Sequence, residues 1–145
     1  MSKTFTLSEA QMMLPLVESL LRRAQAAGER ASEMEREMQE LNQRIFMAGG
    51  MNVDVAKAAR RRANRDKSLQ EARDTLAEME EIGVQVKDLK KGLLDFPSLM
   101  DGQEILLCWK LGESEIGYWH TVEEGYAGRK PLDGRHGKTE RERLN

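Results

Sequence analysis

The N-terminal third of the chain carries an unbroken series of apolar residues separated by alternating steps of three and four. Its members are Ala10, Met13, Val17, Leu20, Ala24, Ala27, Ala31, Met34, Met38, Leu41 and Ile45. Five heptads of this spacing bring every member to one side of an α-helix, a stripe typical of a coiled-coil seam. At about 1.5 Å per residue the predicted helix is roughly 60 Å long and needs a partner along its apolar side.

Local signals set the ends of this helix. Thr6 and Glu9 have the spacing of a capping box, in which each side chain bonds the other residue's amide. Pro15 removes one helical hydrogen bond, so we expect a kink there, or a short first helix joined to a longer one. Gly49 and Gly50, within a turn near residues 48–52, supply the positive φ angles that end a helix.

A second helix is predicted over residues 53–82 and returns antiparallel to the first. Asn52 or Asp54 can cap its start. We expect its seam to be interrupted by the polar run from Asn64 to Ser68 and to contain Ala56, Ala59, Ala63, Leu69, Ala72, Leu76 and Met79.

The second helix begins with a basic block over residues 57–67. One interpretation is a patch that binds RNA or phosphate. Folding the chain at Gly49-Gly50 gives another, because the acidic stretch over residues 29–40 then lies beside the block and can pair with it. We favour the ion pairs, and nucleic acid is not an expected partner, since aromatic residues that stack on bases are missing from the block.

The predicted hairpin tip is apolar for a solvent-exposed turn, with Phe46, Met47 and Met51 close together. Exposed apolar surface of this kind often marks a contact. A protein partner at the tip and packing of these side chains on one another are both open interpretations.

After Ile82 the apolar period changes to that of short strands, and a small antiparallel sheet is predicted. The expected strands are residues 84–86, 93–97, 104–111 and 116–120, with Pro97 ending the second. A loop of two or four residues after Leu111 would bring His120 to the face that carries Ile105, Leu107 and Trp109, with Cys108 and Trp119 opposite.

These elements predict an α+β fold, a long antiparallel helical hairpin followed by a small C-terminal antiparallel β-sheet. We expect a hairpin over residues 1–82, a β unit over 83–128 packed on the hairpin base, and a charged tail over 129–145. The formal net charge of −2 gives no field that favours nucleic acid or membrane. With a single cysteine and no apolar run long enough to span a membrane, a cytoplasmic protein is expected.

Several phrases of the sequence carry a resemblance to a known family. They are FTLSEAQMMLPL, GLLDFPSLMDG, LLCWKLGE, YWH and GYAGRKPL, in that order, and they cover the chain to about Leu132. Together they are similar to a family of uncharacterised bacterial proteins, domain of unknown function 2203. The resemblance implies a bacterial, cytoplasmic protein and supplies no activity, cofactor or catalytic residue.

Four residues of the β unit are candidates for binding a ligand. Asp95 lies between apolar neighbours and can serve as a base, a metal ligand or an anchor for the following turn. His120 is expected on an apolar face, as a hydrogen-bonded core residue or as a ligand. Trp109 is a core residue or part of a stacking pocket, and Arg129 lies in a glycine-rich loop where it can bind a carboxylate or phosphate.

The only cysteine, Cys108, is interpreted as a buried, unreactive thiol, because it has apolar neighbours and no CxxC partner. His136 falls in the polar tail, so a zinc set of the usual spacing is not predicted. Asp95 with His120 is the one pair for which acid–base chemistry or metal binding is worth testing.

Three hypotheses follow for the function. The first is a non-enzymatic interaction or scaffold protein that forms a homo-oligomer, with a dimer favoured, through its hairpin. The second is a small-molecule or metal-binding protein with its site around Asp95 and His120. The third is a transcription accessory factor with a hairpin that enters RNA polymerase, which is disfavoured because the tip offers Asp54 as its one acid.

Overall fold

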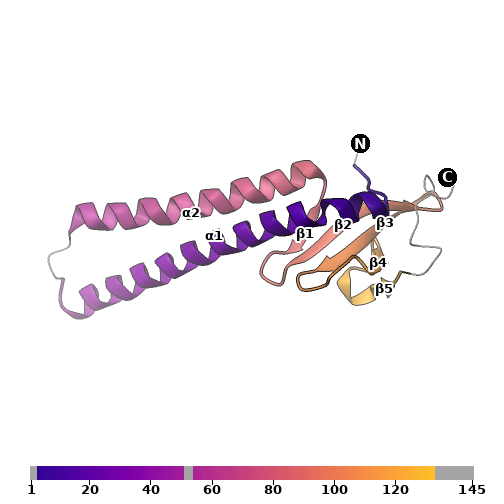
Figure 1. The fold of residues 1–145 in the computed structure, drawn as a ribbon. Coiled ribbons are helices and arrows are strands. Elements are labelled where there is room, and N and C mark those ends of the chain that lie inside the picture. The colour runs from indigo at the N-terminus through magenta and orange to yellow at the C-terminus, as the bar shows by residue number, and fades with distance from the viewer. Residues whose placement is uncertain (1–2, 51–53, 133–145) are drawn as a thin grey trace. The chain divides into compact units, whose positions relative to one another are not determined.

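A computed structural model describes residues 3–50 and 54–132. Two long helices precede a five-stranded antiparallel sheet (Figure 1), which confirms the predicted α+β fold. Met51, Asn52 and most of the predicted tail lie outside the described residues. The elements are α1 (Leu7–Met47), α2 (Val55–Ile82), β1 (Gln85–Asp88), β2 (Leu93–Met100), β3 (Gln103–Lys110), β4 (Tyr118–Thr121), the 3-10 helix η1 (Tyr126–Gly128) and β5 (Lys130–Pro131).

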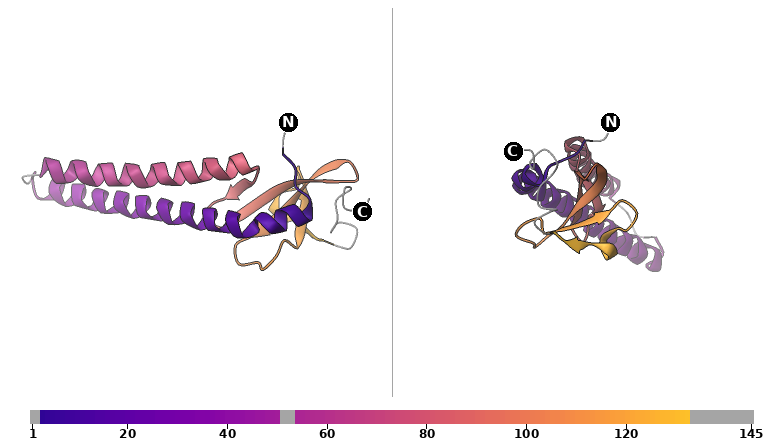
Figure 2. Two further views of the ribbon diagram at one scale, coloured as in Figure 1. Left: turned by 45° about the horizontal axis from the view of Figure 1, so that its top comes forward. Right: turned by 90° about the vertical axis from the view of Figure 1, so that its right-hand side faces the viewer.

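The chain divides into two compact units, and the division cuts both long helices. One unit comprises Arg22–Thr75, and the other comprises the residues before Arg22 and those from Leu76 onward. In the first unit α1 and α2 run side by side in opposite directions (Figures 1 and 2). This unit is called the hairpin unit below, and the other is called the β unit.

The seam predicted for α1 is confirmed, since each of its positions is buried or half-buried. The first half of the seam predicted for α2 is wrong. Ala56, Ala59 and Ala63 are exposed, while Ala58, Arg65 and Ser68 are buried or half-buried in their place. Alanine is a weak marker of a buried face because its methyl group gains little from burial. The polar run is therefore part of the seam rather than an interruption of it.

The helix ends follow the local signals. The Thr6 amide donates to Glu9 Oε1 at 2.8 Å and the Glu9 amide donates to Thr6 Oγ1 at 3.0 Å, which confirms the capping box. Asp54 Oδ1 accepts the Lys57 amide at 3.0 Å and caps α2. Pro15 does not divide α1, which runs as a single helix through it. The alternative of a short first helix joined to a longer one is therefore wrong.

The strands pair in chain order, β1-β2-β3-β4-β5. β2 and β3 are joined by Asp101 and Gly102, whose φ values of 51° and 79° are those of a two-residue turn with left-handed residues. This turn places Asp95 opposite Cys108 and Phe96 opposite Leu107. The predicted end of this strand at Pro97 is wrong, because β2 continues to Met100. The Pro97 carbonyl accepts a hydrogen bond from the Phe5 amide at 2.7 Å.

The predicted pairing of β3 with β4 is wrong by one residue. In the structure Leu106 lies opposite His120, Leu107 opposite Trp119 and Cys108 opposite Tyr118. The loop between the strands has an odd number of residues, and a shift of one residue exchanges the two faces of a strand. His120 therefore shares a face with Cys108, and Trp119 shares the opposite face with Trp109.

The two faces of the sheet have different roles. One face, called the core face, packs in a hydrophobic cluster with the start of α1 and the end of α2. The cluster includes Phe5, Leu14, Val17, Leu21, Met79, Leu94, Phe96, Leu107, Trp109 and Trp119. The opposite face, called the site face, carries Asp95, Leu106, Cys108 and His120, all buried. Burying large apolar residues on the core face stabilises the β unit by about 1.5–3 kcal/mol for each side chain.

No helix among the described residues is long and apolar enough to cross a membrane.

Candidate metal centre

Asp95 lies at the middle of β2 on the site face and is only 2% exposed. Alternation along the strand brings it there, because Leu94 and Phe96 on either side of it belong to the hydrophobic core. A carboxylate buried to this degree needs a charged or hydrogen-bonding partner, since isolated ions are strongly disfavoured in the interior.

His120, from β4, supplies that partner across the intervening strand β3. Its Nε2 lies 3.0 Å from Asp95 Oδ1 and 3.1 Å from Asp95 Oδ2, and the ring is 2% exposed. Its Nδ1 lies 2.8 Å from the Thr121 carbonyl oxygen. A carbonyl oxygen can only accept, so Nδ1 carries a hydrogen. Nε2 and the Asp95 carboxyl group therefore share one proton, which either partner can hold.

Cys108 lies between these two residues on the central strand β3 and is 1% exposed. The ligand atoms of Asp95, Cys108 and His120 all lie within 4.8 Å of one another. Arg129 closes one side of the group, with Nη1 3.9 Å from the Cys108 sulfur. Three adjacent strands thus bring one oxygen, one sulfur and one nitrogen donor to a single buried point.

The electrostatics of the group favour protonated ligands while a metal is not bound. Burial raises the pKa of the Asp95 carboxyl, and the nearby His120 works against that change. Burial also raises the pKa of the Cys108 thiol to about 11, although Arg129 works in the opposite direction. At neutral pH the sulfur therefore keeps its proton until a stronger positive charge displaces it.

The donor set fits a borderline divalent transition metal. Zinc takes thiolate, imidazole and carboxylate ligands at about 2.0–2.3 Å, and three protein ligands with one open position are the pattern of catalytic zinc sites. Ligand atoms around a tetrahedral ion at these bond lengths lie about 3.3–3.8 Å apart. The three ligand atoms lie within 4.8 Å of one another, so their side chains would have to move to reach that geometry. The bond from His120 Nδ1 to the Thr121 carbonyl leaves Nε2 available, and it would orient that nitrogen toward an ion held by the group, as second-shell partners do.

The structure brings together two of the four predicted ligand-binding residues, Asp95 and His120. Trp109 lies on the core face, where it is fully buried and its Nε1 donates to the Glu113 carbonyl at 3.0 Å. Arg129 lies at the edge of the group, where its Nη2 donates to Glu113 Oε2 at 2.6 Å. Its guanidinium carbon lies 3.8 Å from the centre of the Tyr118 ring. Burial opposes the charge on Arg129, yet its bonds to Glu113 and Cys108 hold the pKa of Arg129 above the ordinary value.

Sequence reasoning missed Cys108 as a member of this group. The signal was available in the Asp101-Gly102 turn, since a two-residue hairpin fixes the register that puts Asp95 opposite Cys108. The side of the sheet on which His120 lies had no comparable signal, because it depends on the length of the loop before β4.

Comparison with known proteins assigns a family. A family model described as "Uncharacterized conserved protein (DUF2203)" matches residues 3–132. Neither the search of curated proteins nor that of solved structures found a match. The match includes all five strands and all three residues of the candidate metal centre. The chain therefore belongs to the DUF2203 family of uncharacterized conserved proteins.

Proposed function

We propose that the β unit binds a divalent transition metal, zinc by its donor set, through Asp95, Cys108 and His120. The single observation that carries this proposal is the convergence of three different metal-ligating side chains from three neighbouring strands, each at most 2% exposed. A single metal ion would bind all three donor atoms at once.

A bound dication would leave the buried group without net charge. A metal ion that replaces the shared Asp95–His120 proton and the thiol proton leaves a carboxylate and a thiolate beside a dication. The charges then nearly cancel inside the sheet, where a low dielectric strengthens their attraction. A thiolate ligand also suits a reducing compartment, so we place the protein in the cytoplasm.

Metal titration of purified protein tests the proposal. Wild-type protein, stripped with a chelator, should bind one Zn²⁺ per chain by isothermal titration calorimetry. Asp95→Asn, Cys108→Ser and His120→Asn each remove one ligand and should weaken binding by at least about 100-fold, more than loss of a second-shell partner. Ser98→Ala is the matched control, a buried polar residue of β2 outside the group, bonded to the Phe5 carbonyl at 2.6 Å. Equal affinity in wild type and the three ligand variants would overturn the proposal.

A second candidate function, self-association through the hairpin unit, is supported by the burial pattern of that unit. Among its described residues only small side chains are buried, namely Ala24, Ala27, Ala31, Ser68, Ala72 and Thr75. Several of its larger apolar residues, including Met34, Met38 and Leu41, are half-buried. Helices of this kind gain most of their stability from tertiary packing. We infer that this unit functions as a scaffold that pairs with a second copy, and sedimentation equilibrium should show a dimer.

A further inference from the structure

The hairpin unit has one face with two rows of opposite charge. On α1 the acidic row consists of Glu33, Glu37 and Glu40, and on α2 the basic row consists of Lys57, Arg60 and Lys67. All six side chains are exposed. Successive members of each row are three, four or seven residues apart in the sequence, so each row keeps to one side of its helix.

An ion pair at the end of the rows shows that they lie on the same face. Continuing the acidic row three residues back gives Arg30, and continuing the basic row four residues on gives Glu71. Arg30 Nη2 lies 2.8 Å from Glu71 Oε2. Arg65 and Glu35 form the other described ion pair between the helices, and they fix the same antiparallel register. In that register Glu40 lies level with Arg60, and Glu33 lies level with Lys67.

Half-buried apolar residues of α1 accompany the acidic row. Met34, Met38 and Leu41 each come one position after a residue of that row in the sequence. Within the described residues, Glu37, Glu40, Arg60 and Lys67 make no ion pair. Apolar positions flanked by charged rows are the pattern by which coiled coils choose a partner and its orientation.

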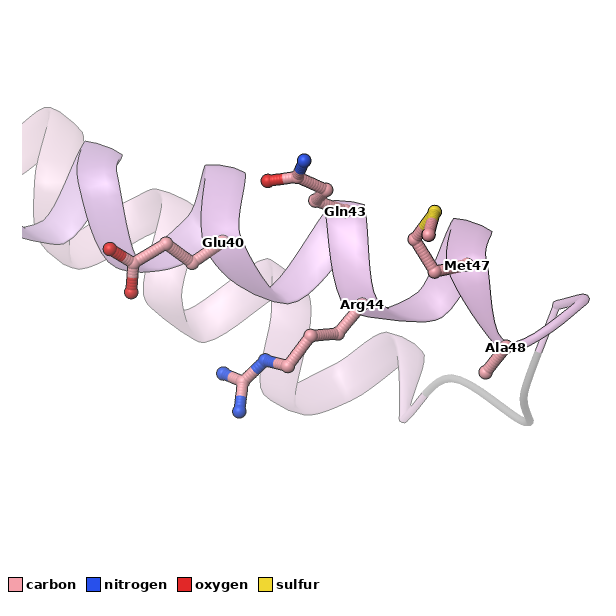
Figure 3. A pocket seen from close by; sticks show the side chains of 5 residues that line it. All are labelled: Glu40, Gln43, Arg44, Met47 and Ala48. Atoms are coloured by element: carbon pink, nitrogen blue, oxygen red, sulfur yellow. The ribbon is translucent and has the colours of Figure 1, made fainter.

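The groove at the end of α1 continues the acidic row toward the tip. Figure 3 shows its lining side chains, Glu40, Gln43, Arg44, Met47 and Ala48, along one side of the last turns of the helix. Met47 is 78% exposed, and Phe46 beside it in the sequence is 82% exposed. The surface that a partner would cover therefore extends to the tip and gains apolar area there.

We propose that two copies pair through this face about a twofold axis parallel to the helices, with both tips at the same end. This inference rests on the proposed self-association and names its geometry. Such an axis brings the acidic row of each copy opposite the basic row of the other at equal height. Glu40 then meets Arg60 of the second copy, and Glu33 meets Lys67. Arg44 meets Lys57, which is the one repulsive position. An antiparallel arrangement would instead oppose like rows, so the charges select the parallel one.

Two charge-reversed variants test the pairing of the rows. E33K/E40K makes the acidic row mainly basic, and R60E/K67E makes the basic row mainly acidic. Each variant alone should dimerise at least about tenfold more weakly than wild type in sedimentation equilibrium, since four attractive contacts become repulsive. An equimolar mixture of the two should recover a dimer. R62E/R73E is the control, with two equal charge reversals on α2 outside the basic row.

The outcomes separate this inference from the self-association on which it rests. Recovery of a dimer in the mixture supports the paired rows and shows that both variants fold. If wild type and both variants dimerise with the same affinity, the pairing of the rows is overturned and self-association is not. A wild-type protein that stays monomeric at high concentration overturns self-association as well. Equal weakening by R62E/R73E would overturn the choice of face.

Discussion

Removing either partner of the Asp95–His120 pair should have unequal consequences in the metal-free protein. His120→Ala leaves the Asp95 carboxyl, whose side chain is 3% exposed, without its partner. Breaking a buried pair from one side costs about 3–5 kcal/mol. Asp95→Asn preserves the shape, and its amide can donate to Nε2, because the Thr121 carbonyl holds the hydrogen on Nδ1. A neutral hydrogen bond in place of a charge-assisted one costs about 1 kcal/mol.

Urea denaturation with a chelator present measures this difference in the free energy of unfolding. His120→Ala should lie about 2–4 kcal/mol below Asp95→Asn. At this chain length, that difference corresponds to a midpoint temperature lower by roughly 4–16 °C. An Asp95→Asn protein as unstable as His120→Ala would refute the shared-proton geometry.

The pH dependence of His120→Ala follows from the Asp95 carboxyl. Burial holds the pKa of this acid above its unfolded value of about 3.9, so its ionised form is penalised in the folded state. The penalty is complete above the folded pKa and disappears as pH falls toward the unfolded pKa. The stability deficit of His120→Ala should therefore be smaller at pH 5 than at pH 8.

Three further predictions concern proton release, a turn and an exposed ion pair. Zinc binding at pH 7 should release two protons per ion, one from the Cys108 thiol and one from the Asp95–His120 pair. Calorimetry in buffers of different ionisation enthalpy measures this number. Binding without proton release would contradict the assigned protonation. Gly92→Ala should destabilise by about 2–4 kcal/mol in urea, because a new Cβ would lie 2.6 Å from Leu111 Cβ at a φ of +73°. The control Gly102→Ala has a similar φ and open space, so an equal loss there would contradict the steric part. Lys130 and Thr121 lower the pKa of Glu124 to about 2. The ionised Glu124 therefore contributes its full stabilisation of the fold above about pH 4.5, and this contribution fades as pH falls to about 2. A loss of unfolding free energy in Glu124→Gln that is the same at pH 7 and pH 2 would contradict this.

Sequence patterns predicted the helices because their signals are local and repeated. The α1 seam follows from eleven regularly spaced residues, and the capping box from Thr6 and Glu9. The α2 seam was predicted less well, because alanines mark both its buried and its exposed sides. Arg65 takes a seam position because its long stem can pack there while the guanidinium reaches Glu35.

The candidate site depended on longer-range geometry. Asp95 and His120 were recognisable as versatile residues among apolar neighbours, but their distance apart depends on two strand registers. The register of β2 with β3 is encoded in the Asp101-Gly102 turn, whereas that of β3 with β4 depends on an irregular loop. An error of one residue in the β3–β4 pairing placed His120 on the face opposite Cys108 and hid the third ligand.

X-ray absorption at the zinc edge of the loaded protein tests the metal centre most directly. The wild-type protein should show one sulfur ligand at about 2.3 Å, with nitrogen or oxygen ligands at about 2.0–2.2 Å. The sulfur should disappear in Cys108→Ser. A wild-type spectrum with only nitrogen and oxygen ligands, or a sulfur that persists in Cys108→Ser, would contradict a centre formed by Asp95, Cys108 and His120.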